Sequence, residues 1–168
     1  ESYDGDRTRI YMTGTSAGAS LCIYLAAMLE SLELAEAFHV IPAELKIRAM
    51  GLVSGMYYTT KPDCIGLFLP SYVYGKQWKK SSFYPYINPE NEAILRHLPP
   101  AFLVTAYGDM LRNYSRQYAE AMKRCGVICH LEDFDTGKKL PHAFSTTFPE
   151  MPESKRANER MVKFLLEH

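Results

Sequence analysis

Short runs of apolar residues alternate with amphipathic segments along this chain. The first of these runs is rich in β-branched and aromatic residues, and the others are mostly apolar, as buried strands are. The runs predicted as strands are residues 9–13, 47–55, 101–106 and 127–134. The segments predicted as helices, in which apolar residues recur every three or four positions, are residues 17–32, 114–125 and 157–165. This alternation indicates an α/β fold, with a parallel sheet flanked by helices on both faces.

The stretch of residues 57–98 interrupts the alternation. It contains four prolines and many aromatic residues, and it shows neither a helical nor a strand period. An irregular segment of this length in a compact domain is usually functional or forms a small subdomain. We therefore interpret residues 57–98 as an aromatic-rich insert within one domain that spans residues 1–168.

Length and charge narrow the class of protein. The chain has 168 residues, which suit a single domain, and its 19 basic residues balance its 19 acidic ones. Without a polybasic run, the sequence favours neither nucleic acid nor an anionic membrane surface as a partner. No apolar run reaches the ~18 residues of a membrane span. The four cysteines are too scattered for a disulfide framework, so free thiols and a cytoplasmic location are expected.

The strongest chemical signal is the segment Gly14-Thr15-Ser16-Ala17-Gly18, a G-x-S-x-G motif between a predicted strand and a predicted helix. In such an elbow, glycines flank the serine because strand and helix pass too closely for Cβ atoms, and the serine has positive φ. The turn presents Ser16 Oγ at the carboxyl edge of the sheet, where open α/β sheets hold ligands. The N–H of Ala17, at the start of the helix, is then a candidate oxyanion donor.

A serine nucleophile needs a base to take its proton and an acid to orient that base. In folds with this elbow the chain order is serine, acid, histidine. Asp109 follows the predicted strand 101–106, and His142 follows the predicted strand 127–134. Both therefore belong to the sheet edge that carries Ser16, and we predict that the three form a catalytic triad.

Other acids and histidines compete for these roles. Asp133 and Asp135 are rival acids, but they flank the strand after the one that precedes Asp109. His39 and His97 belong to connections at the opposite edge of the sheet, and His130 lies inside a predicted strand.

A metal site is a second chemical possibility. Cys125, Cys129 and His130 have a superficially suitable spacing, but a helix end and a strand would scatter these ligands. We expect no metal and no cofactor.

Four segments of the chain resemble the esterase/lipase branch of the α/β-hydrolases that is related to hormone-sensitive lipase. The matching segments are residues 9–19 (RIYMTGTSAGA), 99–104 (PPAFLV), 108–112 (GDMLR) and 142–144 (HAF). In that family the serine, aspartate and histidine of these motifs form the triad, so the resemblance implies these roles for Ser16, Asp109 and His142. It also implies that the chain is the C-terminal portion of an α/β-hydrolase domain.

The sequence departs from the family pattern around and before the elbow. Thr15 replaces a common aspartate and Ala19 a common glycine, which leaves the triad intact and the subfamily open. The upstream His-Gly-Gly motif, which supplies the other oxyanion donors in the family, is absent. We therefore expect an incomplete domain with the strand 9–13 at a sheet edge. By itself, such a chain should hydrolyse activated esters weakly or not at all.

By resemblance, the insert corresponds to the lid and acyl-pocket region of the family. Its aromatic side chains are candidates for an apolar acyl or alcohol pocket. The candidates are Tyr72, Tyr74, Trp78, Phe83, Tyr84 and Tyr86. The alternative is that these rings only pack the insert onto the domain.

Together these observations predict hydrolysis of small carboxylic esters through an acyl-serine intermediate. A peptidase or an acyltransferase could use the same triad, because leaving-group preference depends on the pocket and the lid. The alternative outside enzymology is a non-catalytic, hydrolase-like binding module.

Overall fold

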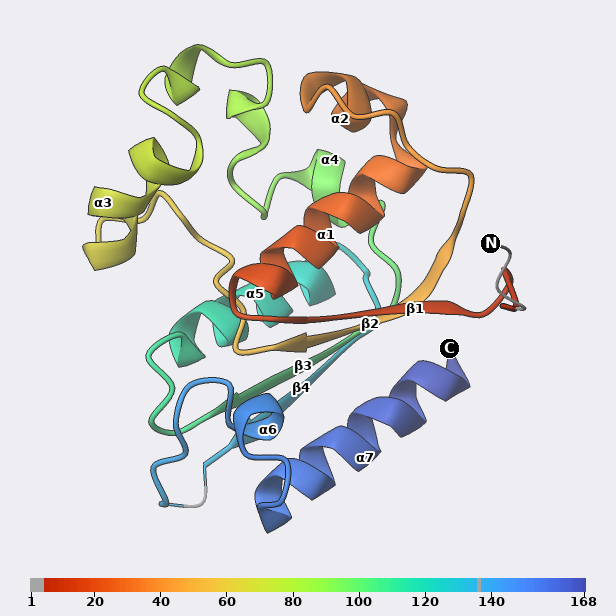
Figure 1. Cartoon of the computed structure of the whole chain (residues 1–168), viewed down its shortest axis with the longest axis vertical. Coiled ribbons are helices and arrows are strands. Elements are labelled where there is room, and N and C mark those ends of the chain that lie inside the picture. The colour runs from red at the N-terminus through yellow and green to blue at the C-terminus, as the bar shows by residue number, and fades with distance from the viewer. Residues whose placement is uncertain (1–4, 136) are drawn as a thin grey trace.

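The computed structural model describes residues 5–135 and 137–168. Its centre is one sheet of four parallel strands in the order β1-β2-β3-β4 (Figure 1). The strands are β1 (Ile10–Thr15), β2 (Ile47–Val53), β3 (Ala101–Ala106) and β4 (Cys129–Phe134). The predicted fold class is confirmed, and β1 lies at one edge of the sheet, as expected.

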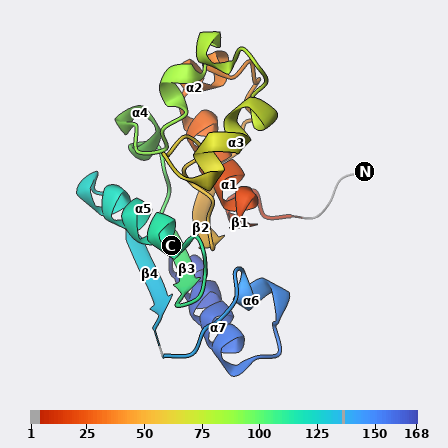
Figure 2. The same cartoon turned by 90° about the vertical axis from the view of Figure 1, so that its left-hand side faces the viewer.

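Helices cover both faces of the sheet. Figures 1 and 2 show α1 and α5 packed on one face and α6 and α7 on the other. The helices on the two faces are α1 (Ala17–Glu30), α5 (Arg112–Arg124), α6 (Phe144–Thr147) and α7 (Pro152–Glu167). The short helix α2 (Leu32–Ala37) packs against α1. Within the described ranges, no helix is both long enough and apolar enough to cross a membrane.

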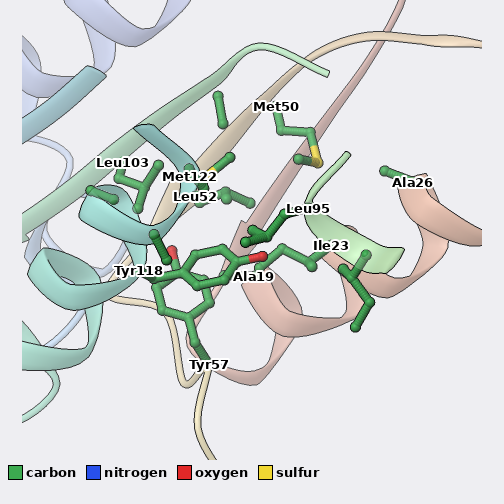
Figure 3. Close-up of a cluster of buried hydrophobic side chains, with 14 of the residues drawn as sticks. Ala19, Ile23, Ala26, Met50, Leu52, Tyr57, Leu95, Leu103, Tyr118 and Met122 are labelled. Carbon is green, nitrogen blue, oxygen red and sulfur yellow. The ribbon is translucent and has the colours of Figure 1, made fainter. Parts of the chain in front are cut away.

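Side chains of the central strands alternate between two cores, as the period of two in a strand requires. Met50, Leu52 and Leu103 are buried in the core beneath α1 and α5 (Figure 3). Phe102 and Val104 are buried in the other core, beneath α7. Both faces of β3 are therefore covered, which explains why its sequence is an uninterrupted apolar run apart from one threonine.

The element boundaries differ from the predicted ones where single residues leave regular backbone. β2 ends at Val53 because Ser54 has a positive φ of 48°. The predicted helix 17–32 divides at Ser31, which is extended and whose hydroxyl accepts the N–H of Leu34 at the start of α2. The closing helix begins at Pro152, whose fixed φ suits a first helical turn, five residues before its predicted start at Ala157.

The insert contains helices that its sequence pattern did not predict. These are α3 (Cys64–Val73), α4 (Glu92–Leu95) and the 3-10 turns η1 (Trp78–Lys80) and η2 (Tyr84–Tyr86). The helix α3 is apolar around most of its circumference, so no periodic stripe marks it in the sequence. Asp63 caps α3 by accepting the N–H groups of Ile65 and Gly66. Figure 2 shows the insert on the α1 side of the sheet.

Candidate active site

Ser16 occupies the turn between β1 and α1. Its φ is 56° and its ψ is −119°, so the predicted positive φ is confirmed. Its N–H donates to the carbonyl oxygen of Val53 at 2.9 Å, and its own carbonyl accepts the N–H of Met56 at 3.0 Å. These two bonds hold the turn against the carboxyl end of β2.

The two flanking glycines of the elbow have different environments. A Cβ on Gly14 would lie 2.4 Å from the carbonyl oxygen of Gly18, so this position admits only glycine without a backbone shift. A Cβ on Gly18 would meet nothing within 4 Å among the described residues. The expectation that both glycines avoid a collision is therefore wrong for Gly18. The close approach is made by the Gly18 backbone onto the Cα of Gly14.

The N-terminus of α1 begins directly after Ser16. Ala17 is the first residue of the helix, so its N–H has no acceptor inside the helix. The positive end of the helix dipole lies at the same place. One backbone N–H without an acceptor in the helix therefore lies next to the serine, as expected for a group that binds an oxyanion.

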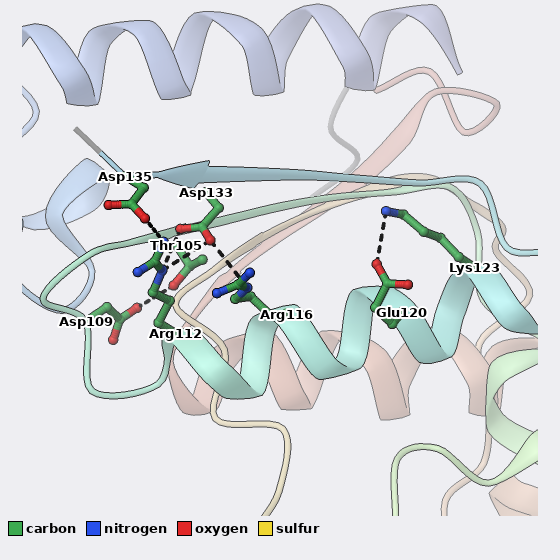
Figure 4. Close-up of polar contacts among 8 residues, drawn as sticks. All are labelled: Thr105, Asp109, Arg112, Arg116, Glu120, Lys123, Asp133 and Asp135. Atoms are coloured by element: carbon green, nitrogen blue, oxygen red, sulfur yellow. Dashed lines mark hydrogen bonds and ion pairs between the residues drawn. The ribbon is translucent and has the colours of Figure 1, made fainter. Parts of the chain in front are cut away.

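Asp109 lies just beyond the carboxyl end of β3 and is held from several sides. Its side chain is 0% exposed. Oδ2 accepts the hydroxyl of Thr105 at 3.1 Å (Figure 4). Oδ1 accepts the N–H of Leu111 at 2.9 Å. The turn before it needs Gly108, which has φ of 107° and passes so close to Leu140 that a Cβ would lie 2.7 Å from its carbonyl oxygen.

His142 lies in the loop after β4 and contacts Asp109. Its Nδ1 is 2.8 Å from Asp109 Oδ1, a distance at which an Nδ1–H donates to the carboxylate. The imidazole is 32% exposed, so its other nitrogen remains accessible. The loop is fixed on both sides of the histidine, because Leu140 N–H donates to Tyr107 O at 2.8 Å and Ala143 N–H donates to Ser54 Oγ at 3.0 Å.

The serine and the histidine belong to the same sheet edge. The N–H of Ser16 donates to the carbonyl oxygen of Val53. The N–H of Ala143, the residue after His142, donates to Oγ of Ser54, which directly follows Val53 in the chain. Within residues 5–135 and 137–168, Ser16 Oγ makes no hydrogen bond with His142, so the expected direct bond between them is not formed here. Such catalytic bonds often form only when substrate is bound.

The rival acids are engaged elsewhere. Arg112 donates to Asp133 at 2.8 Å and to Asp135 at 2.8 Å (Figure 4). These hydrogen bonds with the two carboxylates raise the pKa of Arg112. Of the three candidate acids, the structure brings only Asp109 to His142.

The candidate pocket residues have unequal positions. Tyr72 is 90% exposed and faces solvent. Tyr74 packs against Trp78 and Phe83, with ring centroids 6.2 and 5.7 Å apart, and Trp78 packs against Tyr84. Tyr74 and Trp78 also line a shallow depression of the surface, which the triad candidates do not line. The hydroxyl of the sixth ring, Tyr86, donates to Glu33.

The remaining histidines and cysteines form no metal centre in the described part of the chain, where no group of three or more potential ligands converges. His130 lies in β4, 3.3 Å from Glu132 and stacked on Phe102. All four cysteines are free, and burial raises the pKa of Cys129 to about 11.

Two residues of this edge, Thr105 and Ser54, were not predicted from the sequence. Thr105 is the one hydroxyl in the apolar run of β3 and lies four residues before Asp109. Ser54 immediately follows the apolar run of β2. A lone hydroxyl at the carboxyl end of a buried strand is the signal that could have found both.

Comparison with known proteins identifies the family of this fold. A family model described as the alpha/beta hydrolase fold matches residues 1–146, and the chain therefore belongs to the alpha/beta-hydrolase family. No curated protein matches the sequence.

Solved structures with this fold include several esterases. Esterase B from Lactobacillus rhamnosis has 21% identity and a TM-score of 0.83, and the match covers 95% of this chain and 53% of that one. An esterase from the bacterial hormone-sensitive lipase family has 20% identity and a TM-score of 0.70, with 95% and 53% covered. An esterase/lipase from an uncultured bacterium has 22% identity and a TM-score of 0.68, with 96% and 54% covered. The chain spans about half the length of these structures.

Proposed function

We propose that this chain carries the nucleophile, acid and base of a carboxylic ester hydrolase that works through an acyl-Ser16 intermediate. The observation that carries the proposal is the 2.8 Å contact of a fully buried Asp109 with His142, on the sheet edge where Ser16 occupies a strained elbow. A buried carboxylate that orients a partly exposed imidazole is the arrangement that a serine nucleophile requires.

The proposed reaction has two stages. In the first, His142 takes the hydroxyl proton as Ser16 Oγ attacks the ester carbonyl carbon, and the resulting oxyanion faces the N–H of Ala17. The C–O bond of the ester breaks, and the alcohol leaves with the proton held by His142. In the second, His142 takes a proton from water, whose oxygen attacks the acyl carbon. The proton then returns to Ser16 Oγ as the carboxylic acid departs.

The substrate that we propose is a small-molecule ester, and the reaction needs no cofactor. One structural neighbour, esterase B from Lactobacillus rhamnosis, is known in a form inhibited with a C4-C4 SN3 tributyrin phosphonate. Because the chain spans about half of that protein, the proposal concerns the full-length protein. With Ala17 as its one assigned oxyanion donor, the isolated 168-residue chain is expected to turn over activated esters weakly or not at all.

A chain-length series of p-nitrophenyl esters, with the matching p-nitroanilides, tests the function in the full-length protein. We expect turnover of esters by the wild type and a loss of about 10⁴-fold or more in kcat for Ser16→Ala. Preferential cleavage of the anilides would favour a peptidase, and acyl transfer to an added alcohol would favour an acyltransferase. Tight binding of the esters without any turnover would favour a binding module.

A further inference from the structure

Residues with an unfavourable positive φ are concentrated at the proposed active site. In the described ranges, four residues other than glycine have positive φ, and three of them are Ser16 at 56°, Ser54 at 48° and Ala143 at 58°. A residue with a Cβ keeps such a backbone only where its surroundings hold it there. Ser16 and Ala143 are the proposed nucleophile and the neighbour of the proposed base. Ser54 has no role in the reaction described above.

Ser54 is fully buried and joins β2 to the histidine loop. Its N–H donates to Val104 O at 2.8 Å, which extends the bonding between β2 and β3 by one residue. Its side-chain Oγ accepts the N–H of Ala143, the residue after His142, at 3.0 Å. Ser54 and Ala143 are both buried, so without this hydroxyl the N–H of Ala143 would lose its acceptor away from water.

The residue before Ser54 makes the complementary contact. Val53 O accepts the N–H of Ser16 at 2.9 Å. Two consecutive residues at the end of β2 therefore hold the backbone of the nucleophile and the backbone next to the base. This pair of bonds ties the turn at Ser16 and the loop after His142 to the same strand end, whereas the bond with Asp109 holds the imidazole ring.

We propose that Ser54 is a positioning residue that places His142 against Ser16 through the N–H of Ala143. The inference rests on the proposed function and adds a residue to it. Ser54 holds the backbone next to the base and is fully buried, so its loss should lower kcat and leave KM nearly unchanged. Misplacement of a catalytic group by about 1 Å is enough to cost roughly a hundredfold in rate.

The test compares Ser54→Ala, Ser54→Gly and the control Ser145→Ala in the full-length protein. Ser145 lies three residues after His142 and is also fully buried, and its hydroxyl has no partner in the described part of the chain. We expect kcat to fall about tenfold or more in both Ser54 variants, with KM within about twofold, and Ser145→Ala to match the wild type.

The two Ser54 variants separate positioning from stability. Glycine adopts positive φ at little cost, whereas the Cβ of alanine makes it unfavourable, so Ser54→Gly should melt at a higher temperature than Ser54→Ala. If Ser54 were only structural, activity would follow this order of stability. The proposal requires both variants to lose kcat to a similar extent, and wild-type-like kcat in either folded variant would overturn it.

Amide hydrogen exchange in the wild type provides a measurement that does not depend on whether the variants fold. The N–H of Ala143 should exchange slowly, as a buried bonded amide does, and exchange at the rate of an open loop would contradict the proposal.

The activity of Ser16→Ala distinguishes a failure of the proposed function from a failure of the role of Ser54. Residual wild-type activity in that variant would reject the proposed function itself, whereas an inactive Ser16→Ala beside fully active Ser54 variants would reject only the role of Ser54.

Discussion

The carboxyl edge of the sheet and the aromatic insert differ in how their side chains are held. At the edge, Asp109 is fully buried and each of its oxygens accepts a hydrogen bond. In the insert, Leu67, Phe68 and Tyr72 of α3 are 74%, 73% and 90% exposed. The edge is built from the ends of four paired strands, of which β2 and β3 are almost completely buried, whereas the insert is built from short helices and turns.

On the proposed function, this difference separates the groups that carry the chemistry from the segment that meets the substrate. Catalytic groups need placement within a fraction of an ångström, which strand ends packed in a core provide. A segment that meets substrates tolerates variation in its sequence and structure, because its contacts are adaptable. The insert is still attached to the domain by specific bonds: Tyr24 OH of α1 donates to Ile87 O at 2.8 Å, and Tyr114 OH of α5 donates to Asp63.

The largest expected effect is at the edge. Asp109→Asn in the full-length protein should lower kcat by about 10⁴-fold while the protein stays folded, because the amide supports the wrong histidine tautomer. The matched control is Asp133→Asn, which breaks the pair with Arg112 at 2.8 Å but does not touch His142. Ester kinetics and circular dichroism check both variants. A large loss of kcat in the control, with near-normal activity in Asp109→Asn, would transfer the role of the acid.

Thiol reactivity provides the second contrast between the sheet and more exposed segments. Burial raises the pKa of Cys129, at the start of β4, to about 11, while Cys64 of α3 and Cys125 are exposed. At pH 8 only about one Cys129 in a thousand is then a thiolate, the reactive form. Iodoacetamide should modify Cys64 and Cys125 about a hundredfold or more faster than Cys129, as measured by peptide mass spectrometry. Equal rates would mean that the sheet opens as readily as the insert.

The smallest effect concerns the anchoring of the insert. The hydrogen bond from Tyr114, followed by the backbone N–H of Gly66, lowers the pKa of Asp63 below its ordinary value of 3.8. A carboxyl with a lowered folded pKa stabilises the protein above its ordinary pKa, and this stabilisation is lost as the pH falls through the lowered value. Asp63→Ala should cost about 1 kcal/mol at neutral pH, and less in acid.

Asp63→Asn is the control for that measurement. Asparagine keeps the cap of α3 but carries no charge, so it should cost less than alanine and remove the pH dependence. Urea unfolding at neutral and acidic pH measures both variants. A loss that is the same at every pH would show that the cap alone, without the charge, anchors α3.

The sequence predicts candidate site residues best where a local motif and the topology of a parallel sheet point to the same edge. A G-x-S-x-G between strand and helix admits few conformations, and acids and bases that follow parallel strands must meet at one edge. Ser16, Asp109 and His142 could therefore be named as candidates from the sequence, and the structure brings Asp109 to His142. The role proposed for Ser54 could not be predicted, because it comes from a hydrogen bond with the backbone of a residue 89 positions away.

The insert was least predictable from the sequence. Its helix α3 is apolar on nearly every side, so it carries no periodic signal, and the exposure of Tyr72 follows from how α3 is placed. Aromatic content alone does not distinguish a ring that lines a depression of the surface, such as Trp78, from one that faces solvent.

The most direct test of the account is covalent labelling of the full-length protein with a fluorophosphonate ester, followed by peptide mapping. The probe phosphonylates a serine oxygen only where a base removes its proton, and fluoride leaves. We predict one adduct, on Ser16, formed with parallel loss of esterase activity and absent from Ser16→Ala. Labelling of another residue, or full esterase activity with Ser16 completely modified, would contradict the assignment of Ser16 as the nucleophile.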